Sequence, residues 1–541
     1  MADETVLLRV SQGELRGRRR RTAWGFPYVS FQGIPYAQPP VGPLRFKPPQ
    51  PAGAWTGVFD ATKQGNVESQ LNISTGKYEG EEDCLFINVF TPKLPSEGAR
   101  GLPVMFLIHG GGLSAFSGNE EWFGPDLLIQ HGIVMVTFNY RLGVLGFLST
   151  GDDVVPGNMG FKDQVLALHW VRDNISSFGG DPDNVTIFGC SAGGWSTHAL
   201  VLSPMAKGLF RRAIAQSGVA TGDGAFTKDV RARSFLLGEH LGLKTQDSKE
   251  LVEFLRKQPD RLLQESALFG RTEEDKARSW IFPFVGTLEP PDAEGGAFMT
   301  RHPTDIMLSG DFQPVPFIVG VCDFEGSVTA TVAMLEREMV SRVARCPRLL
   351  LPGDLRCSEA EKDTVAEEVR RFYFGDRQIG PETEKQFYDL YGDRTFTCAA
   401  VRAAKVHSAK SSQPVYFYNF DIQRELVPQG PLMAQLAQSM DKLKGTGHGA
   451  DMAFLFRNIM FGEPPEKDSE DGKIAMKMTR LWTNFAKTGQ PTDPELDVSW
   501  PAFTVDDPAY LYVGRQGFIV ERRPFAERAA FWEALYQRYG G

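Results

Sequence analysis

The sequence predicts an α/β protein with a central, mostly parallel and twisted sheet that is flanked by helices. Apolar, strand-like runs at residues 104–108, 185–188 and 316–321 each lead into a turn that contains glycine. The second run continues through Gly-Cys-Ser-Ala-Gly into helix-compatible residues from Trp195. A strand, a sharp turn and a helix therefore follow one another, as in α/β proteins that present a reactive side chain at the end of a strand.

The turn at residues 189–193 has the Gly-x-Ser-x-Gly pattern of a nucleophile elbow, with Ser191 at its centre. The two glycines are needed because a Cβ would clash where the turn folds the strand against the helix. The strained turn holds Oγ of Ser191 clear of the sheet, facing a substrate and a base. The pentapeptide alone is a weak signal, because an ordinary strand-to-helix turn can have the same pattern.

A second motif, His109-Gly-Gly-Gly112, follows directly after the apolar run 104–108. A glycine triplet at the end of a strand lets successive backbone N–H groups point into one pocket. The N–H groups of Gly111 and Gly112, joined by that of Ala192, are expected to form an oxyanion hole. Each such donor stabilises a transition state by about 3–4 kcal/mol.

These motifs, with others spread along the whole chain, resemble the type-B carboxylesterase and cholinesterase family of α/β-hydrolases. The resemblance implies the α/β-hydrolase fold, with large insertions around an active-site gorge. Gly-Pro-Asp at 124–126 and the block around His448 look most like insect intracellular α-esterases. The other matching segments are residues 31–46, 82–89, 139–147, 157–164, 178–182, 482–491 and 531–532.

In α/β-hydrolases the catalytic residues follow the order serine, acid, histidine along the chain. Five of the eight histidines follow Ser191. His448 stands in a glycine-bracketed loop, Gly445-Thr-Gly-His-Gly449, which suits a general base. The other four are interpreted as ordinary core or surface histidines; they are His198, His240, His302 and His407.

The strand-like run 316–321 leads to two candidate acids, Asp323 and Glu325, and either could orient the imidazole. The family pattern ends in Glu-Gly, so the resemblance favours Glu325. It also places the hydroxyl of Ser217 close to the triad. Cys190, which directly precedes the nucleophile, is expected beside the triad as well. The same resemblance implies two ion pairs that hold loops, Arg45 with Glu82 and Arg141 with Asp163.

The expected chemistry is ester hydrolysis through an acyl-enzyme. His448 removes the proton of Ser191 as Oγ attacks the ester carbonyl, then protonates the leaving alcohol, and water repeats the sequence. No metal or organic cofactor is needed, and the chain has no Cys-x-x-Cys pair or His-Glu-x-x-His motif.

Length and charge favour one large globular domain over residues 1–541. The chain has 42% hydrophobic residues and a net charge of −9, with no linker or composition break. The run Arg18–Arg21 is expected to be a solvated hairpin turn, and nucleic-acid binding has no other support. Residues 524–541 are expected to form an amphipathic helix, and no membrane span is predicted.

Cysteine usage predicts a cytoplasmic protein. In the family pattern Cys84 and Cys398 are halves of disulfides, but the partner positions hold Glu68 and Ala529. Two orphaned halves are hard to reconcile with an oxidising compartment. Residues 1–9 have no apolar stretch long enough for a signal peptide.

Several departures from the cholinesterase pattern bear on the substrate. Residues 68–84 contain no tryptophan to stack on a quaternary ammonium, and Cys190 replaces a glutamate common in the family. Both argue against choline esters. The stretch 219–225 also lacks a tryptophan, and Gly224 falls near the usual acyl-pocket position. An open acyl side is therefore expected, which Leu113, in place of phenylalanine, favours weakly.

The predicted function is hydrolysis of small to medium uncharged esters, with detoxification of xenobiotic esters as one role. Organophosphates and carbamates are the expected inhibitors. A lipid- or hormone-ester esterase of the juvenile-hormone type is the first alternative. A non-catalytic, cholinesterase-like binding or adhesion protein is the second, and it predicts that triad residues are lost. The sequence makes no prediction of an oligomeric state.

Overall fold

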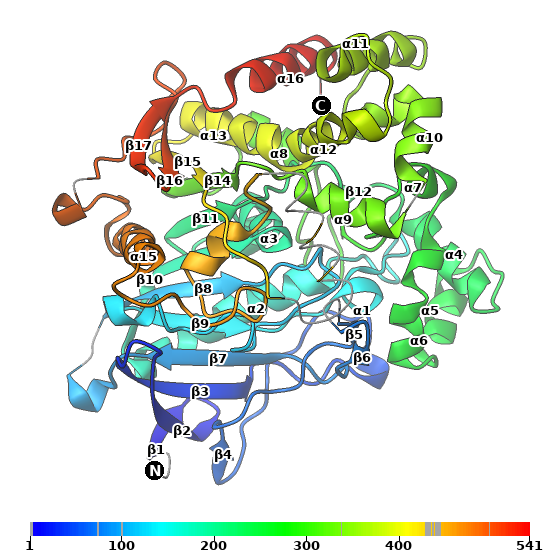
Figure 1. The fold of residues 1–541 in the computed structure, drawn as a ribbon. Helices are drawn as coiled ribbons and strands as arrows, with labels where there is room; N and C mark the ends of the chain where they lie inside the picture. The colour runs from blue at the N-terminus through cyan, green and yellow to red at the C-terminus, as the bar shows by residue number, and fades with distance from the viewer. Residues whose placement is uncertain are drawn as a thin grey trace.

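The structure is a computed structural model that describes residues 4–72, 75–98, 101–336, 338–427, 434, 438, 445–496 and 498–540. A 13-stranded sheet forms its centre, in the order β1-β2-β3-β7-β9-β8-β10-β11-β14-β15-β16-β17, with β4 beside β2. The strands from β9 to β16 run parallel, whereas β1, β2, β3 and β7 at one edge and β17 at the other pair antiparallel. The mostly parallel α/β sheet predicted from the sequence is confirmed (Figure 1).

The strands of this sheet are β1 (Thr5–Val10), β2 (Gly13–Arg21), β3 (Pro27–Pro35), β4 (Val58–Asp60), β7 (Phe86–Thr91), β8 (Leu102–Ile108), β9 (Val134–Phe138), β10 (Gly180–Cys190), β11 (Arg212–Gln216), β14 (Phe317–Cys322), β15 (Val415–Asp421), β16 (Ala509–Gly514) and β17 (Gly517–Arg522). Two small sheets lie outside it. They pair β5 (Gln70–Leu71) with β6 (Tyr78–Glu79), and β12 (Phe226–Thr227) with β13 (Gly286–Thr287).

The α-helices of the described residues are α1 (Gly143–Phe147), α2 (Met159–Asn174), α3 (Ala192–Leu202), α4 (Val230–His240), α5 (Ser248–Arg256), α6 (Asp260–Glu265), α7 (Glu273–Ala277), α8 (Pro303–Ser309), α9 (Ser327–Leu335), α10 (Met339–Arg345), α11 (Lys362–Phe374), α12 (Glu384–Gly392), α13 (Cys398–Lys410), α15 (Glu470–Thr488) and α16 (Ala526–Tyr539). Among the described residues, no helix is both long enough and apolar enough to cross a membrane.

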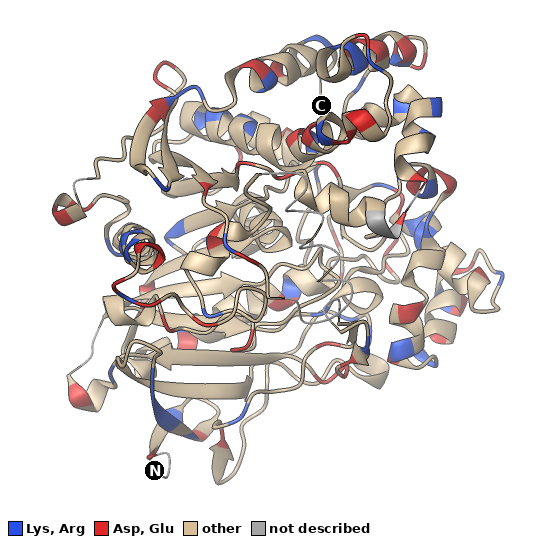
Figure 2. Ribbon diagram, in the orientation of Figure 1, with Lys and Arg blue, Asp and Glu red and all other residues tan. Residues whose placement is uncertain are grey.

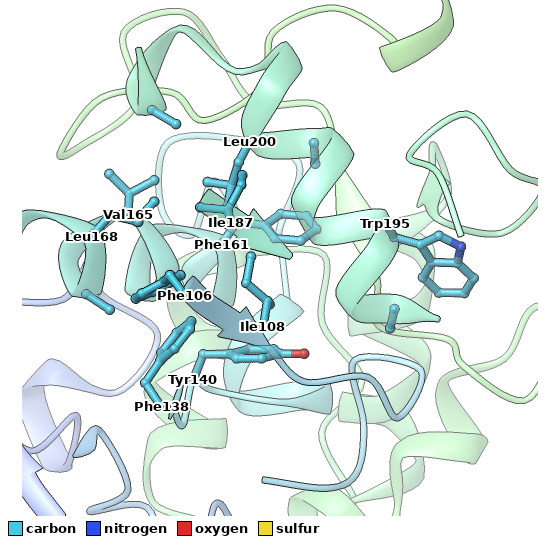
Figure 3. Packing of buried hydrophobic residues seen from close by; sticks show 14 of the residues in the cluster. Phe106, Ile108, Phe138, Tyr140, Phe161, Val165, Leu168, Ile187, Trp195 and Leu200 are labelled. Carbon is cyan, nitrogen blue, oxygen red and sulfur yellow. The ribbon is translucent and has the colours of Figure 1, made fainter. Parts of the chain in front are cut away.

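Alternate side chains of the central strands enter two separate cores. Phe106 and Ile108 of β8 belong to the cluster that also holds residues of α2 and α3, whereas Met105 and Leu107 belong to the cluster with α15. Because successive side chains of a strand point to opposite faces, both faces of the sheet are covered by helices. Figure 3 shows the first of these cores, with Phe106, Ile108 and Phe161 together.

A third apolar cluster holds the helices inserted between β14 and β15 together with the C-terminal helix. Trp532 of α16 packs with residues of α11 and α12, and the rings of Phe372 and Phe531 stack with centroids 4.0 Å apart. These helices lie together at the top of the view in Figure 1. Figure 2 shows that Lys, Arg, Asp and Glu gather on such peripheral helices and are sparse in the central strands.

One sequence expectation about this sheet is wrong. The arginine run 18–21 lies within strand β2, not in a hairpin turn, and pairs with β3 through Arg18 and Ser30. Arg19 contacts Glu97, and Arg20 contacts Glu120. Carboxylates supplied from elsewhere in the chain therefore allow this charged run to take part in the sheet. The single domain over residues 1–541 stays a prediction, although one sheet takes strands from both ends of the chain.

Candidate active site

The serine elbow is formed as the sequence predicts. Strand β10 ends at Cys190, helix α3 begins at Ala192, and Ser191 between them has φ 62° and ψ −125°, a strained conformation for a residue with a side chain. A Cβ added to Gly193 would lie 2.1 Å from the carbonyl oxygen of Ile108. Glycine is therefore required because the elbow packs directly on the backbone of the neighbouring strand β8.

The glycine loop lies against this elbow because β8 and β10 are parallel neighbours and both end at the same edge of the sheet. A Cβ on Gly110 would lie 2.7 Å from the carbonyl oxygen of Cys190 and 3.3 Å from Cβ of Ser191. Gly111 and Gly112 have φ angles of 98° and 63°, which favour glycine. The N–H groups of Gly111, Gly112 and Ala192 donate no hydrogen bond to any other described residue. They are available to a ligand.

His448 and Glu325 meet on the other side of the elbow. Nδ1 of His448 lies 2.5 Å from Oε2 of Glu325, and the carboxylate is fully buried. Oε1 of Glu325 accepts a hydrogen bond of 2.7 Å from the backbone N–H of Cys322. Asp323, the other candidate acid, instead pairs with Asn419. The geometry therefore gives His448 one carboxylate partner, Glu325.

The loop of His448 is held on two sides. Its backbone N–H donates to Oγ of Ser327 at 2.8 Å, and Gly447 forms a bridge with Phe324. A Cβ on Gly449 would lie 3.6 Å from Sγ of Cys190, so the loop also touches the elbow. Nε2 of His448 is buried and has no hydrogen-bond partner among the described residues. This nitrogen is free to receive a proton.

The other four histidines that follow Ser191 are core or surface residues, as interpreted from the sequence. Nε2 of His198 lies 2.9 Å from Nε2 of His407, and burial lowers the pKa of His407 to about 3. Burial also lowers the pKa of His302, whose Nδ1 accepts a hydrogen bond from the first turn of helix α8. The ring of His240 stacks on that of Phe269.

A buried polar cluster lies behind the elbow, and sequence reasoning missed its central residue, Asp451. Oδ2 of Asp451 accepts hydrogen bonds of 2.7 Å from Nε2 of Gln216 and from the hydroxyl of Tyr418. Burial raises the pKa of this carboxyl. The only available signal was its position three residues after His448. Since Gln216 also accepts the N–H of Ser191 through its carbonyl, Asp451 connects the histidine loop to the elbow.

The two residues expected beside the triad lie in this cluster. Oγ of Ser217 is 3.8 Å from Sγ of Cys322, the residue whose N–H holds Glu325. Cys190 is buried, and burial raises the pKa of its thiol well above the usual value. A thiol with a raised pKa stays protonated at neutral pH and is a poor nucleophile. Cys190 therefore lacks the thiolate form that a cysteine nucleophile needs.

The two ion pairs implied by the resemblance are present. Nε of Arg45 lies 2.6 Å from Oε1 of Glu82, and Nη2 of Arg141 lies 2.7 Å from Oδ1 of Asp163. Arg141 and Asp163 are both buried, and neither pair reaches the catalytic groups directly. They hold loops, as expected.

The cysteine positions also behave as the sequence suggests. Glu68 does lie opposite Cys84, whose Sγ donates to Oε2 at 2.8 Å, and burial raises the pKa of the Glu68 carboxyl well above its usual value. All six cysteines are free thiols: Cys84, Cys190, Cys322 and Cys398 are buried, Cys357 is half-buried and Cys346 is exposed.

A cavity of about 570 Å³ is lined by Phe396, whose ring lies 4.6 Å from that of His448, and this cavity corrects one sequence expectation. Gly224 lines it, but a Cβ on Gly224 would lie only 2.0 Å from the ring of Trp280. The aromatic side chain that residues 219–225 lack is therefore supplied by another segment. Phe282 packs in the same way on Gly112. Gly224 makes room for a ring and does not by itself open the cavity.

Leu113, which the sequence suggested as a residue of the acyl pocket, also lies elsewhere. It is fully buried in the main core, has φ 57°, and its carbonyl accepts a hydrogen bond of 2.7 Å from the N–H of Gly143. It is not among the residues that line the cavity. The expectation that Leu113 is a pocket residue is therefore wrong, because the tight turn after Gly112 directs it into the core.

Comparisons with known proteins agree with this geometry. The model of the carboxylesterase family matches residues 4–532. Juvenile hormone esterase of Tribolium castaneum is 34% identical, covering 93% of this chain and 89% of its own. Esterase FE4 of Myzus persicae is 36% identical, covering 92% and 87%. The crystal structure of juvenile hormone esterase from Manduca sexta, with OTFP covalently attached, superposes with a TM-score of 0.87 at 29% identity, covering 99% of this chain and 100% of that one. The chain therefore belongs to the carboxylesterase family and is a carboxylic ester hydrolase.

Proposed function

We propose that Ser191, His448 and Glu325 are the catalytic triad of this esterase, with the N–H groups of Gly111, Gly112 and Ala192 as its oxyanion hole. The observation that carries the proposal is the state of the His448 imidazole. Glu325 holds Nδ1 at 2.5 Å, while the buried Nε2 has no partner among the described residues. An imidazole fixed at one nitrogen and free at the other is the arrangement that a general base requires.

The reaction then has two similar halves, acylation of Ser191 and hydrolysis of the acyl-serine. Nε2 of His448 takes the proton of the Ser191 hydroxyl while Oγ bonds to the ester carbonyl carbon, and the carbonyl oxygen becomes an oxyanion. Collapse of this intermediate breaks the bond to the alkoxy group, which leaves as an alcohol with the proton from Nε2. Water, deprotonated by the same nitrogen, attacks the acyl-serine and releases the acid.

Glu325 stabilises the imidazolium that forms in both halves. Its carboxylate is fully buried and its second oxygen already accepts the N–H of Cys322, so the charge is fixed in place before the reaction starts. Preorganised charges of this kind lower the barrier because nothing has to reorient during the proton transfer.

The substrate class that we favour is small to medium uncharged esters, including xenobiotic esters. The part of the cavity wall that reaches the proposed site is aromatic: the ring of Phe396 lies 4.6 Å from that of His448, and Phe282 packs on Gly112. Charged side chains line other parts of the cavity, among them Asp229 and Arg301. Cys190 places a neutral thiol where a carboxylate would attract a cationic substrate. Choline esters are therefore disfavoured.

Hydrolysis of longer lipid- or hormone-type esters is the second candidate. It is favoured by the volume of the cavity and by the similarity to juvenile hormone esterases from two insects. Cavities of 300–1,000 Å³ accommodate ligands well beyond a short acyl group.

The two candidates are separated by measuring kcat/KM for p-nitrophenyl esters of graded acyl length and for long-chain methyl esters. The first candidate predicts the highest values for short to medium aryl esters, and the second predicts them for long-chain methyl esters. An organophosphate should inactivate the enzyme stoichiometrically, with the adduct on Ser191 by mass spectrometry. An adduct on Cys190 would contradict the proposed nucleophile.

We also propose that the protein is cytoplasmic. Support comes from Glu68, which occupies the place of a disulfide partner and hydrogen-bonds Cys84 instead. Fractionation of the cells that express the protein tests this proposal. Recovery of the protein in a secreted or lumenal fraction would contradict it.

A further inference from the structure

The backbone turn that follows the glycine loop is held by a buried side chain from another segment, Gln70 of strand β5. Oε1 of Gln70 accepts a hydrogen bond of 2.6 Å from the backbone N–H of Phe116, and Nε2 donates to the carbonyl oxygen of the same residue at 2.9 Å. Nε2 also donates to the carbonyl oxygen of Glu68 at 3.2 Å. Gln70 is only 2% exposed, so these backbone groups fix the orientation of its amide.

The peptide group that Gln70 holds lies against the proposed oxyanion hole. The N–H of Phe116 and the carbonyl of Ala115 belong to one peptide group. A Cβ on Gly111 would lie 2.1 Å from that carbonyl oxygen, so this peptide group packs directly on the Cα of Gly111. A peptide group is planar, and in the trans form its N–H and C=O point in opposite directions. By holding the N–H side, Gln70 therefore fixes the side that contacts Gly111.

The same turn sets the direction of the N–H of Gly112. The carbonyl of Gly111 accepts hydrogen bonds from the N–H groups of Ser114 and Ala115, each at 3.0 Å. In the trans peptide that joins Gly111 to Gly112, the N–H of Gly112 points away from this carbonyl. The turn from residue 111 to residue 116 thus determines where one proposed oxyanion donor points.

This turn is strained and needs support from outside. Phe116 has φ 76°, a left-handed conformation that residues with a side chain rarely adopt. Such conformations persist where surrounding contacts impose them. Gln70 binds both backbone polar groups of Phe116, and the ring of Phe116 packs on that of Trp122 with centroids 4.2 Å apart. Loss of the two hydrogen bonds lets Phe116 relax, which moves the peptide group that contacts Gly111.

We propose that Gln70 is a positioning residue of this esterase, because its carboxamide holds the turn that places Gly111 and aims the N–H of Gly112 at the oxyanion. The inference rests on the proposed function, since it requires that these N–H groups form the oxyanion hole. A carboxamide suits this role because one of its atoms accepts and the other donates. Gln70 acts through the backbone and not on the substrate.

The first test compares Gln70→Met with the wild type in hydrolysis of p-nitrophenyl butyrate, with rates expressed per folded protein. Methionine keeps the length of the side chain and removes both hydrogen-bonding atoms. We expect kcat to fall about a hundredfold, as for a displacement of about 1 Å in a catalytic site. KM should stay within about twofold, because the oxyanion forms only after substrate is bound and in both halves of the reaction.

Gln164→Met is the matched control. Gln164 is also a buried glutamine, but its Nε2 donates to Oγ of Ser196 at 3.1 Å and not to the glycine loop. The control should keep kcat within about twofold of the wild type. A fall of kcat in Gln70→Met that is no larger than the fall in Gln164→Met would overturn the inference.

The second test uses phenethyl trifluoromethyl ketone as a probe of the oxyanion hole. Oγ of Ser191 bonds to its carbonyl carbon, the hydroxyl proton passes to Nε2 of His448, and the carbonyl oxygen becomes an oxyanion. Because this adduct resembles the tetrahedral intermediate, its inhibition constant should rise in Gln70→Met by about the factor by which kcat falls. An inhibition constant equal to that of the wild type would overturn the inference.

The third test is a rescue that depends on pH. In Gln70→Glu, a protonated carboxyl both accepts from the N–H of Phe116 and donates to its carbonyl, whereas a carboxylate only accepts. The kcat of this variant divided by that of the wild type should therefore rise as pH falls from pH 8 to pH 5. The quotient cancels the titration of His448, which both enzymes share. The same quotient for Gln70→Met should not change with pH.

These outcomes separate a positioning role from a structural one and from failure of the proposed function. A Gln70→Met protein that unfolds more easily but keeps the kcat of the wild type per folded molecule would overturn the inference. If Gln70→Met does not fold, the pH dependence of Gln70→Glu still decides, and a quotient that does not rise toward low pH and stays far below one would overturn it. The proposed function fails instead if Ser191→Ala keeps its activity or if the folded wild type hydrolyses no ester.

Discussion

Two regions close to Ser191, the elbow with its glycine loop and the cavity wall, are built in opposite ways. The elbow and the glycine loop are the ends of neighbouring strands β10 and β8, and their backbones touch: a Cβ on Gly193 would lie 2.1 Å from the Ile108 carbonyl. The cavity wall is built from side chains, with Trp195, Trp280 and Phe396 brought from three distant segments. Backbone contact requires glycine and so leaves a sequence pattern, whereas a wall of side chains leaves none.

The largest effect expected from this comparison is at the elbow. Ser191→Ala should lower kcat by about a million-fold on aryl esters, and His448→Ala nearly as much, because triad residues act as a unit. The double variant should lose little more than either single one. Steady-state kinetics on a p-nitrophenyl ester is the measurement, and near-normal turnover by Ser191→Ala would exclude it as the nucleophile.

The next effect tests the backbone contact itself. Gly193→Ala places a Cβ against the Ile108 carbonyl, so the elbow has to shift. We expect a loss of about 1–3 kcal/mol in stability, as for an overpacked core, and about a hundredfold in kcat from displacement of the nucleophile.

Urea unfolding and kinetics measure the two parts of this Gly193→Ala prediction. Gly53→Ala is the matched control, because a Cβ at Gly53 meets nothing within 4 Å. Equal behaviour of the two variants would mean that the close approach of β8 and β10 does not position the serine.

A smaller effect is expected in the cavity wall. Trp280→Ala removes the ring that covers Gly224 and should raise the preference for longer acyl chains. Each additional buried methylene contributes at most about 0.8 kcal/mol, or about fourfold in kcat/KM. A series of p-nitrophenyl esters from acetyl to decanoyl measures it, with Trp55→Ala, beside strand β4, as the control. An unchanged chain-length profile would remove Trp280 from the determinants of acyl selectivity.

The smallest expected effect concerns the hydrogen bond between Cys84 and Glu68, at the place where the family resemblance implies a disulfide. Burial raises the pKa of Glu68 well above its usual value, so the folded state favours the protonated carboxyl. The stabilisation from Glu68 is then complete below the unfolded pKa of about 4.3 and is lost as pH rises through the higher folded pKa. Glu68→Gln keeps a neutral side chain and should lack this loss.

Urea unfolding of the wild type and Glu68→Gln at intervals from pH 5 to pH 8 measures this difference. The variant should gain stability relative to the wild type as pH rises. Glu253→Gln, at an exposed position on α5, serves as the control and should follow the wild type. Parallel curves for the wild type and Glu68→Gln would show that Glu68 is charged in the folded protein.

The sequence by itself determined the sheet class, the elbow, the glycine loop and the choice of His448, because each depends on local backbone geometry or on chain order. It left Asp323 and Glu325 open from the residues alone, and only the fold shows which carboxylate reaches the imidazole at 2.5 Å. Asp451 was missed for the same reason, since its partners, Gln216 and Tyr418, come from two other strands.

Only the tertiary structure decided the shape of the cavity. The predicted pocket roles of Gly224 and Leu113 rested on their neighbours in sequence. The space at Gly224 is instead filled by Trp280, 56 residues later in the chain, and the side chain of Leu113 is buried in the core. The arginine run 18–21 forms part of strand β2 because Glu97 and Glu120, from other segments of the chain, pair with Arg19 and Arg20. A local pattern reports what the backbone needs at that point, whereas the occupant of a space depends on which distant side chain the fold brings there.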